Sequence, residues 1–200
     1  MALGKRAAAR RARLLELGPK LFGAKSYDRV SIENIAEAAG ASPGLLYHYF
    51  GGKRAYYVAS IEYATERLVA HTVEGIMTSP KPRALGGLRA YFNFVESEPE
   101  TYLVILQAGI GADREVARIL DQTRSRFVEL ILKTAKMDTE GPLARVAIRG
   151  WVGMVEAMSL DWLERGEEER VDREAMLDLL LKAGIVVVQT AMGGSLPGEP

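Results

Sequence analysis

The chain has 200 residues, of which 48% are hydrophobic, and it has no cysteine. This is enough for one or two domains with a real core, and it excludes disulfides and thiolate metal sites. The formal net charge is zero. No apolar run approaches the roughly 20 residues that span a bilayer, and no apolar signal core follows the basic N-terminus, so we expect a cytoplasmic protein without a membrane partner.

Charge is unevenly distributed along the chain. Residues 1–54 carry ten Lys and Arg against four acids, whereas the remainder carries 16 bases against 22 acids. A basic N-terminal segment favours contact with phosphates. Five basic residues precede the first acid: Lys5, Arg6, Arg10, Arg11 and Arg13. They form either a solvated tail or an arm that follows phosphates or reaches a minor groove.

The first helix is predicted over residues 5–22, where Leu14, Leu17 and Leu21 line one face. Proline removes one backbone hydrogen bond and crowds the preceding turn. Gly18-Pro19 therefore predicts a kink near residues 15–19 or a split helix.

A pair of short helices follows, over residues 31–39 and 42–49. Ser31 is an N-cap candidate, and Gly40 tolerates the left-handed geometry that ends a helix. Ser42 and Pro43 fit the N-cap and first position of the second helix. The short break between them is typical of a helix-turn-helix, whose second helix enters the DNA major groove.

Residues 35–53, IAEAAGASPGLLYHYFGGK, resemble the DNA-binding motif of the TetR family of bacterial transcription regulators. The resemblance is carried by Ile35, Ala36, Ala39, Gly40, Ser42, Gly44, Leu46, Tyr47, Tyr49, Phe50 and Lys53. It implies an all-α protein with an N-terminal three-helix DNA-binding domain, residues 1–54. A larger helical ligand-binding and dimerisation domain, residues 55–192, and a disordered tail, residues 193–200, complete the expected chain. Gly18-Pro19 departs from the family pattern.

Nine residues are expected to contact a double-stranded DNA operator. Candidates for base edges are Ser42, Pro43, Gly44, Leu45 and His48. Candidates for phosphates are Ser31, Tyr47, Tyr49 and Lys53. Leu46 and Phe50 should face the core and Tyr47 should be partly buried. Which of Tyr47, His48 and Tyr49 points to DNA stays open, because neighbours lie about 100° apart on a helix.

The rest of the chain also reads as helix, and no strand pattern occurs. Further helices are expected from residue 53 to a break at 78–82, and then over residues 84–97, 98–109, 113–136, 142–165 and 172–191.

The last two helices are apolar nearly all round. Such helices are either central in the monomer or buried by an outside partner. The resemblance implies that they form a four-helix interface in a homodimer. The expected interface residues are Val146, Gly150, Gly153, Ala157, Leu177, Leu181, Gly184 and Val188.

The residue inventory argues against an enzyme. The chain has two histidines, and no phosphate-cradling loop or nucleophile elbow is visible. We expect neither a cofactor nor a metal. Bulky and partly polar residues fall on helices that surround an effector cavity in the family, although such residues also form plain core. They are Tyr91, Phe94, Tyr102, Leu106, Gln107, Trp151, Met154 and Met158.

The resemblance therefore predicts a repressor that a small lipophilic effector releases from a palindromic operator. The alternative is a DNA-bound scaffold on the same fold that recruits a protein partner and has no effector.

Overall fold

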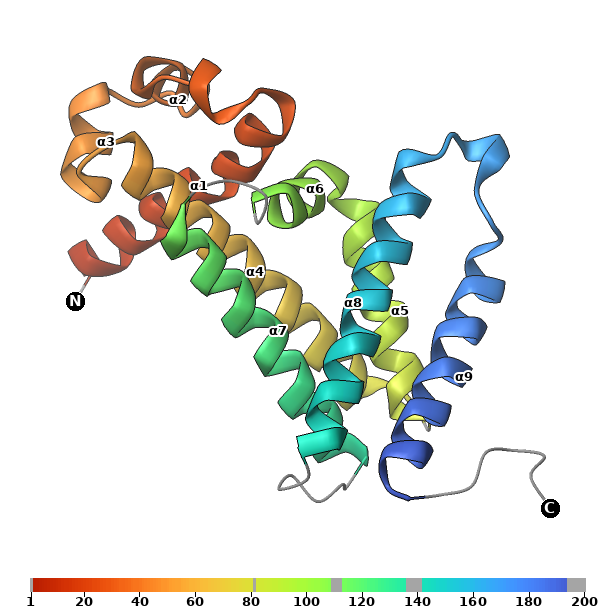
Figure 1. Cartoon of the computed structure of the whole chain (residues 1–200). Coiled ribbons are helices and arrows are strands. Elements are labelled where there is room, and N and C mark those ends of the chain that lie inside the picture. Colours follow the sequence, from red (N-terminus) through yellow and green to blue (C-terminus); the bar gives the residue numbers. More distant parts are fainter. Residues whose placement is uncertain (1, 81, 109–112, 136–141, 194–200) are drawn as a thin grey trace. The chain divides into compact units, whose positions relative to one another are not determined.

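The computed structural model describes residues 2–80, 82–108, 113–135 and 142–193 (Figure 1). Within these ranges the chain forms nine α-helices and two short 3-10 turns, which confirms the predicted all-α class. The helices are α1 (Ala2–Ala24), α2 (Ile32–Ala38), α3 (Pro43–Phe50), α4 (Lys53–Thr78), α5 (Arg83–Ser97), α6 (Pro99–Ala108), α7 (Arg114–Ala135), α8 (Pro142–Glu164) and α9 (Arg173–Ala191). The 3-10 turns are Tyr27–Arg29 and Glu167–Glu169. None of the described helices is long and apolar enough to cross a membrane.

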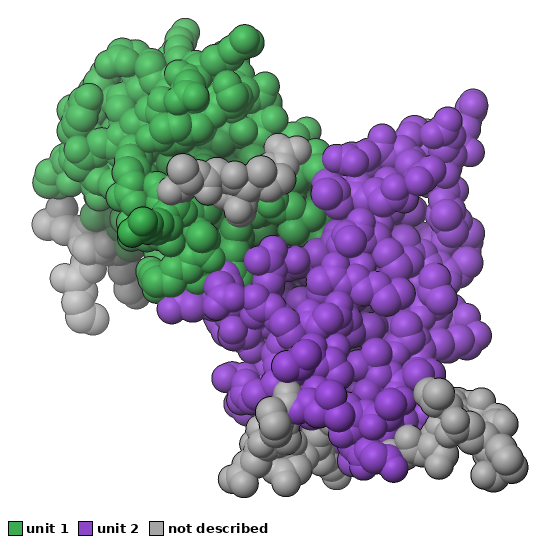
Figure 2. Space-filling model, viewed as in Figure 1, with its two compact units in different colours: residues 1–67, 98–120 green, residues 68–97, 121–200 purple. Residues whose placement is uncertain are grey.

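The chain divides into two compact units (Figure 2). Unit 1 consists of residues 1–67 and 98–120, and unit 2 consists of residues 68–97 and 121–200. The domain boundary that the sequence predicts after residue 54 falls in the first turn of α4. Residues 55–67 and 98–120 pack with the N-terminal helices because α6 lies along α1 and because Tyr56 is completely buried.

Helix α1 runs unbroken through Pro19, so of the two predicted alternatives, a kink or a split helix, the split is excluded. Contacts with α4 hold the segment that precedes the proline. The hydroxyl of Tyr56 donates to the carbonyl oxygen of Leu14 at 2.5 Å. A Cβ atom at Gly18 would lie 2.1 Å from the Oγ of Ser60, so only glycine allows this approach of the two helices. Pro19 costs the helix one hydrogen bond, and these tertiary contacts keep the helix intact.

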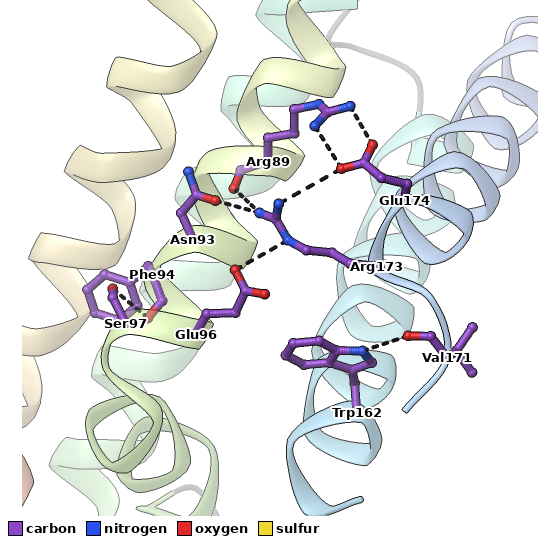
Figure 3. A network of polar contacts seen from close by, with 9 residues as sticks. All are labelled: Arg89, Asn93, Phe94, Glu96, Ser97, Trp162, Val171, Arg173 and Glu174. Atoms are coloured by element: carbon purple, nitrogen blue, oxygen red, sulfur yellow. Dashed lines mark hydrogen bonds and ion pairs between the residues drawn. The ribbon is translucent and has the colours of Figure 1, made fainter. Parts of the chain in front are cut away.

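In unit 2, α9 packs against α5 and α8. A polar network joins the start of α9 to the second half of α5 (Figure 3). Arg89 and Glu174 form a two-pronged ion pair, and Arg173 donates to the side chain of Asn93 and pairs with Glu96 at 3.3 Å. This network fixes one end of the α5–α9 pair, while the opposite ends of both helices border the pocket described below.

Candidate nucleic-acid interface and ligand pocket

The turn between α2 and α3 is fixed by the caps that the sequence predicts. Ser31 accepts a hydrogen bond from the backbone of Asn34, and the Asn34 side chain accepts one from the backbone of Ser31, both at 3.1 Å. This reciprocal pair satisfies two amides at the start of α2. At its end Gly40 has a φ of 58°, and the N–H of Ala41 donates to the carbonyl of Ala36 at 2.9 Å. The left-handed glycine closes α2 and starts the turn.

Helix α3 is anchored at its start and along one face. Ser42 caps it by accepting a hydrogen bond from the N–H of Leu45 at 3.3 Å, and Pro43 takes the first helical position. Leu46 is completely buried and Phe50 is buried at 9% exposure. These two side chains fix the rotation of α3 about its axis, as the sequence predicts.

The opposite face of α3 is exposed. Pro43 and Tyr47 are four residues apart, as are Gly44 and His48, and all four are exposed. Tyr49 is half-buried. The prediction that Tyr47 is partly buried is wrong, because its side chain is 52% exposed. Tyr47 lies one helical turn after Pro43 on the outer face, which leaves no core for it to join.

Two cations lie beside the end of α3. The ammonium of Lys53 is 4.1 Å from the ring centroid of Tyr27, and the guanidinium of Arg11 is 5.2 Å from that of Phe50. Cation–π contacts of this kind hold a flexible side chain in place. They set positive charge at the C-terminal end of α3.

Arg54 pairs with two acidic residues rather than with an aromatic ring. It donates to both oxygens of Asp113, at 2.9 and 3.0 Å, and to Glu115 at 3.1 Å. Burial acts to raise the pKa of Asp113, but hydrogen bonds from Arg54 and from the N–H groups of Glu115 and Val116 outweigh it, and the pKa lies below its usual 3.8. Arg54 therefore ties the start of α4 to the start of α7 within unit 1.

The basic N-terminal residues lie on a helix rather than on a tail. Arg6, Arg10 and Arg13 follow the spacing of one helical face and are exposed. None of the three forms a hydrogen bond or ion pair with another described residue. Because Arg11 on the same helix contacts Phe50, this end of α1 adjoins the end of α3.

Unit 2 contains a pocket of about 1020 Å³. Its walls come from α4, α5, α7, α8 and α9 and are mainly apolar. The lining includes Thr72, Ile76, Pro82, Arg83, Ala84, Gly87, Leu88, Tyr91, Phe127, Leu130, Ile131, Thr134, Ala135, Ile148, Trp151, Val152, Val155, Glu156, Leu181, Gly184, Ile185, Val187, Val188 and Gln189. A mainly apolar concavity with a few polar groups is typical of a small-molecule site.

Glu156 is the acidic group of the pocket wall, and its charge is already paired. The Nε of Arg124 donates to both Glu156 oxygens at 2.9 Å. Burial raises the pKa of Glu156, and the charges of Arg124 and Arg149 oppose that rise. The pair joins α7 to α8 across one side of the pocket.

Trp151 forms the junction between α8 and α9. Its indole N–H donates to the carbonyl oxygen of Leu180 at 2.9 Å. A Cβ atom at Gly184 would lie 2.9 Å from the Trp151 ring. The glycine thus lets α9 approach the indole, whose polar group is satisfied and whose ring faces the pocket.

Comparisons with known proteins identify the family of this chain. Residues 14–59 match the family model described as bacterial regulatory proteins, tetR family. Residues 80–187, more than half of the chain, match the model of the tetracyclin repressor-like C-terminal domain. The chain belongs to the TetR family. This family consists of DNA-binding transcription regulators, so the prediction that the chain is not an enzyme is confirmed.

A curated relative and several similar solved structures cover most of the chain. The HTH-type transcriptional activator FasR of Mycolicibacterium smegmatis is 23% identical over 92% of this chain and 82% of its own length. A TetR-family regulator from Streptomyces coelicolor has a TM-score of 0.73 at 24% identity, covering 96% of this chain and 92% of that one. FadR of Bacillus subtilis, solved in complex with stearoyl-CoA, has a TM-score of 0.68 at 14% identity, covering 88% and 96%. At these identities the solved structures establish the TetR fold alone.

The pocket lies closer to the N-terminal ends of α5 and α8 than the sequence predicts. Tyr91 and Trp151 line it, whereas Phe94, Tyr102, Leu106, Met154 and Met158 are not among its lining residues. Phe94 and Tyr102 are buried core, and Tyr102 and Leu106 belong to unit 1, where α6 packs on α1. The side chain of Gln107 lies outside the described residues. The prediction rested on the helices that surround the cavity in the family, and neither that resemblance nor helical spacing tells which face borders an empty space.

The predicted interface residues separate into two groups. On α8, Val146, Gly150, Gly153 and Ala157 form an exposed stripe, with Val146 at 70% exposure. On α9, Leu177 is completely buried within the chain and has no surface left for a partner. Leu181, Gly184 and Val188 line the pocket, and the close approach expected of Gly184 is to Trp151 of the same chain.

Several residues that shape these sites were not predicted from the sequence. Arg83 and Glu156 line the pocket although neither belongs to an apolar stripe. Arg54 and Asp113 are 59 residues apart, and no local pattern joins them. Among the described residues no cluster of three or more potential metal ligands occurs.

Proposed function

We propose that this TetR-family regulator is a repressor that binds a palindromic operator as a homodimer and leaves it when a small lipophilic effector binds. The observation that carries the proposal is the mainly apolar pocket of about 1020 Å³ in a chain that also presents a capped helix-turn-helix. Action on bacterial operator DNA also implies a cytoplasmic location.

The exposed face of α3 is the surface that we propose to contact the operator. Pro43 offers apolar contact to thymine methyl groups, and Gly44 lets the backbone come close to a base. His48 can hydrogen-bond to a base edge. Tyr47 on the side of α3 and Lys53 just beyond its end are placed to contact the phosphates that flank the groove. Ser31, Ser42, Leu45 and Tyr49 remain proposed contacts. The caps of α2 and α3 would fix the conformation of this surface in the DNA-free protein.

The exposed stripe on α8 is the proposed dimer contact. Val146, Gly150, Gly153 and Ala157 are small or apolar, and a Cβ atom added at either glycine would have no described atom within 4 Å. A twofold axis would bring this stripe against its own copy, as in most homodimers. Two recognition helices would then read half-sites about one turn of DNA, roughly 34–36 Å, apart.

The pocket is the proposed effector site. FadR of Bacillus subtilis was solved with stearoyl-CoA, a ligand with a long apolar chain, and this supports a lipophilic effector here. A ligand that binds better to a DNA-incompetent state lowers operator affinity by linkage, whatever the structural route between the two sites.

An activator is the second candidate, because the name of the relative FasR describes an activator. Both candidates share the DNA and effector sites, and they differ in what the bound dimer does to RNA polymerase. Transcription in vitro from the bound promoter separates them: added protein lowers transcript yield for a repressor and raises it for an activator.

One experiment tests the proposal as a whole. The operator is selected from random DNA with purified protein, and its binding is followed by fluorescence anisotropy while fractionated lipid extract is added. We expect a palindromic site, a 2:1 protein-to-duplex ratio and release by an apolar fraction that also raises the melting temperature. A site without twofold symmetry, or binding that no fraction alters, would contradict the proposal.

A further inference from the structure

We infer that the pocket takes an amphiphile whose head group is anionic, and that Arg83 binds that head while the apolar walls take the tail. This inference rests on the proposed effector role of the pocket and names the chemical class of its ligand.

The lining is strongly biased toward apolar groups. Of the 24 lining residues in the described part of the chain, only Arg83 and Glu156 carry a charge. Its volume of about 1020 Å³ lies at the upper end of the roughly 300–1,000 Å³ usual for ligand pockets. A ligand that fills such a space must present a large apolar surface.

Most polar groups in the walls already have partners within the chain. The hydroxyls of Thr72 and Thr134 donate to backbone carbonyls one turn earlier, at 2.8 and 2.7 Å. The indole N–H of Trp151 donates to Leu180. These groups therefore offer apolar methyls and a ring to a ligand rather than hydrogen-bond donors.

Glu156 is poorly suited to attract a cationic head group. Both of its oxygens accept from Arg124, and Arg149 adds a further favourable charge. A cationic ligand would have to displace Arg124 from an ion pair that is largely shielded from water. The acidic side of the pocket is thus electrically satisfied.

Arg83 differs from Glu156 in that its charge is not paired within the described residues. It is the first residue of α5, its side chain is exposed, and it forms no hydrogen bond or ion pair with another described residue. Arginine stays protonated at any physiological pH, and its planar fork matches a carboxylate or phosphate in a two-point contact. The unbalanced charge at the pocket is therefore positive, and it complements an anionic head.

The test compares three probes with the same twelve-carbon tail: dodecanoate, dodecan-1-ol and dodecyltrimethylammonium. The two ionic probes are kept below their micelle concentrations and the alcohol below its solubility limit. Binding to the full-length protein is measured by calorimetry and by the shift in melting temperature. We expect dodecanoate to bind about tenfold or more tightly than dodecanol, in line with a charge-assisted hydrogen bond. In Arg83→Gln this preference should disappear while dodecanol affinity stays the same.

Arg126→Gln is the matched control, because Arg126 is exposed on α7, does not line the pocket and forms no hydrogen bond or ion pair with another described residue. It should keep the full preference for dodecanoate. Equal affinities for acid and alcohol in the unaltered protein would overturn the inference and leave the apolar effector site standing. If dodecyltrimethylammonium binds most tightly, Glu156 rather than Arg83 binds the head group, and the inference is overturned as well. If none of the three probes binds, the effector role of the pocket fails together with the inference.

Discussion

The indole ring of Trp151 in α8 lies directly against the backbone of Gly184 in α9, so that a Cβ atom at residue 184 would be 2.9 Å from the ring. Real Cβ atoms do not approach a ring this closely, so either the indole or one of the two helices would have to shift. The pair thus sets both the spacing of α8 and α9 and the position of a pocket wall.

Gly184→Ala should therefore lower stability by about 1–3 kcal/mol, the usual cost of overpacking, and should weaken effector binding because the displaced indole enters the pocket. Thermal melting and ligand calorimetry measure the two effects. A second substitution, Trp151→Phe, removes the indole atoms that clash. The double variant should therefore lose less free energy of unfolding than the sum of the losses of the two single variants. Strict additivity would show that this approach of the two helices does not limit packing.

Lys53→Ala should weaken binding to operator and non-operator DNA alike and flatten the log–log salt dependence by about one unit, because Lys53 would neutralise one phosphate. Anisotropy titrations at several salt concentrations measure the slope. Lys25→Ala, which removes an exposed lysine outside the helix-turn-helix, should leave the slope unchanged. An unaltered slope for Lys53→Ala would remove Lys53 from the residues that bind phosphate.

The arginine stripe on α1, formed by Arg6, Arg10 and Arg13, should bind further phosphates beyond the helix-turn-helix. Replacing the three arginines together with glutamine should flatten the salt slope by about 0.9 for each phosphate that is no longer neutralised. The control removes the same number of charges from unit 2, at Arg126, Lys133 and Arg145, all of which are exposed. If both triple variants change the slope equally, the stripe acts only through net charge and does not touch the DNA.

Gly150→Leu should disrupt the dimer without unfolding the protomer. A Cβ atom added at this position has no described atom within 4 Å, but a leucine side chain there would hold two copies of α8 apart. Light scattering coupled to chromatography should show a monomer with unchanged helical circular dichroism and no operator binding. Arg145→Leu adds a similar apolar side chain on another face of α8 and should remain dimeric. A tight dimer of Gly150→Leu would place the interface elsewhere.

The ion pair between Arg54 and Asp113 should make stability depend on acid pH. The pKa of Asp113 is lowered in the folded protein, so its contribution is present above the unfolded value near 3.8 and is lost as pH falls through the folded pKa. The melting temperature of the unaltered protein should exceed that of Asp113→Asn at pH 7, and the difference should shrink below pH 4. A difference that is constant with pH would mean that Asp113 acts as a helix cap alone.

The sequence by itself determined the helical class, the helix-turn-helix and the buried face of α3. These features depend on signals that act over three or four residues: the serine caps at Ser31 and Ser42, the stop at Gly40, and the spacing of Leu46 and Phe50. Local signals survive in any tertiary context that keeps the helix. The caps and the core side of α3 were therefore predicted residue by residue.

Only the tertiary structure decided which helical faces enclose the pocket, where Arg54 finds its partner and which neighbour Gly184 approaches. Each of these depends on helices that are far apart in sequence, such as the 59 residues between Arg54 and Asp113. An apolar stripe is buried equally well against any complementary stripe, so periodicity cannot name its partner. That is why Phe94 and Tyr102 were expected at the pocket and lie in the core, while Arg83, which no periodic pattern singles out, lies at its edge.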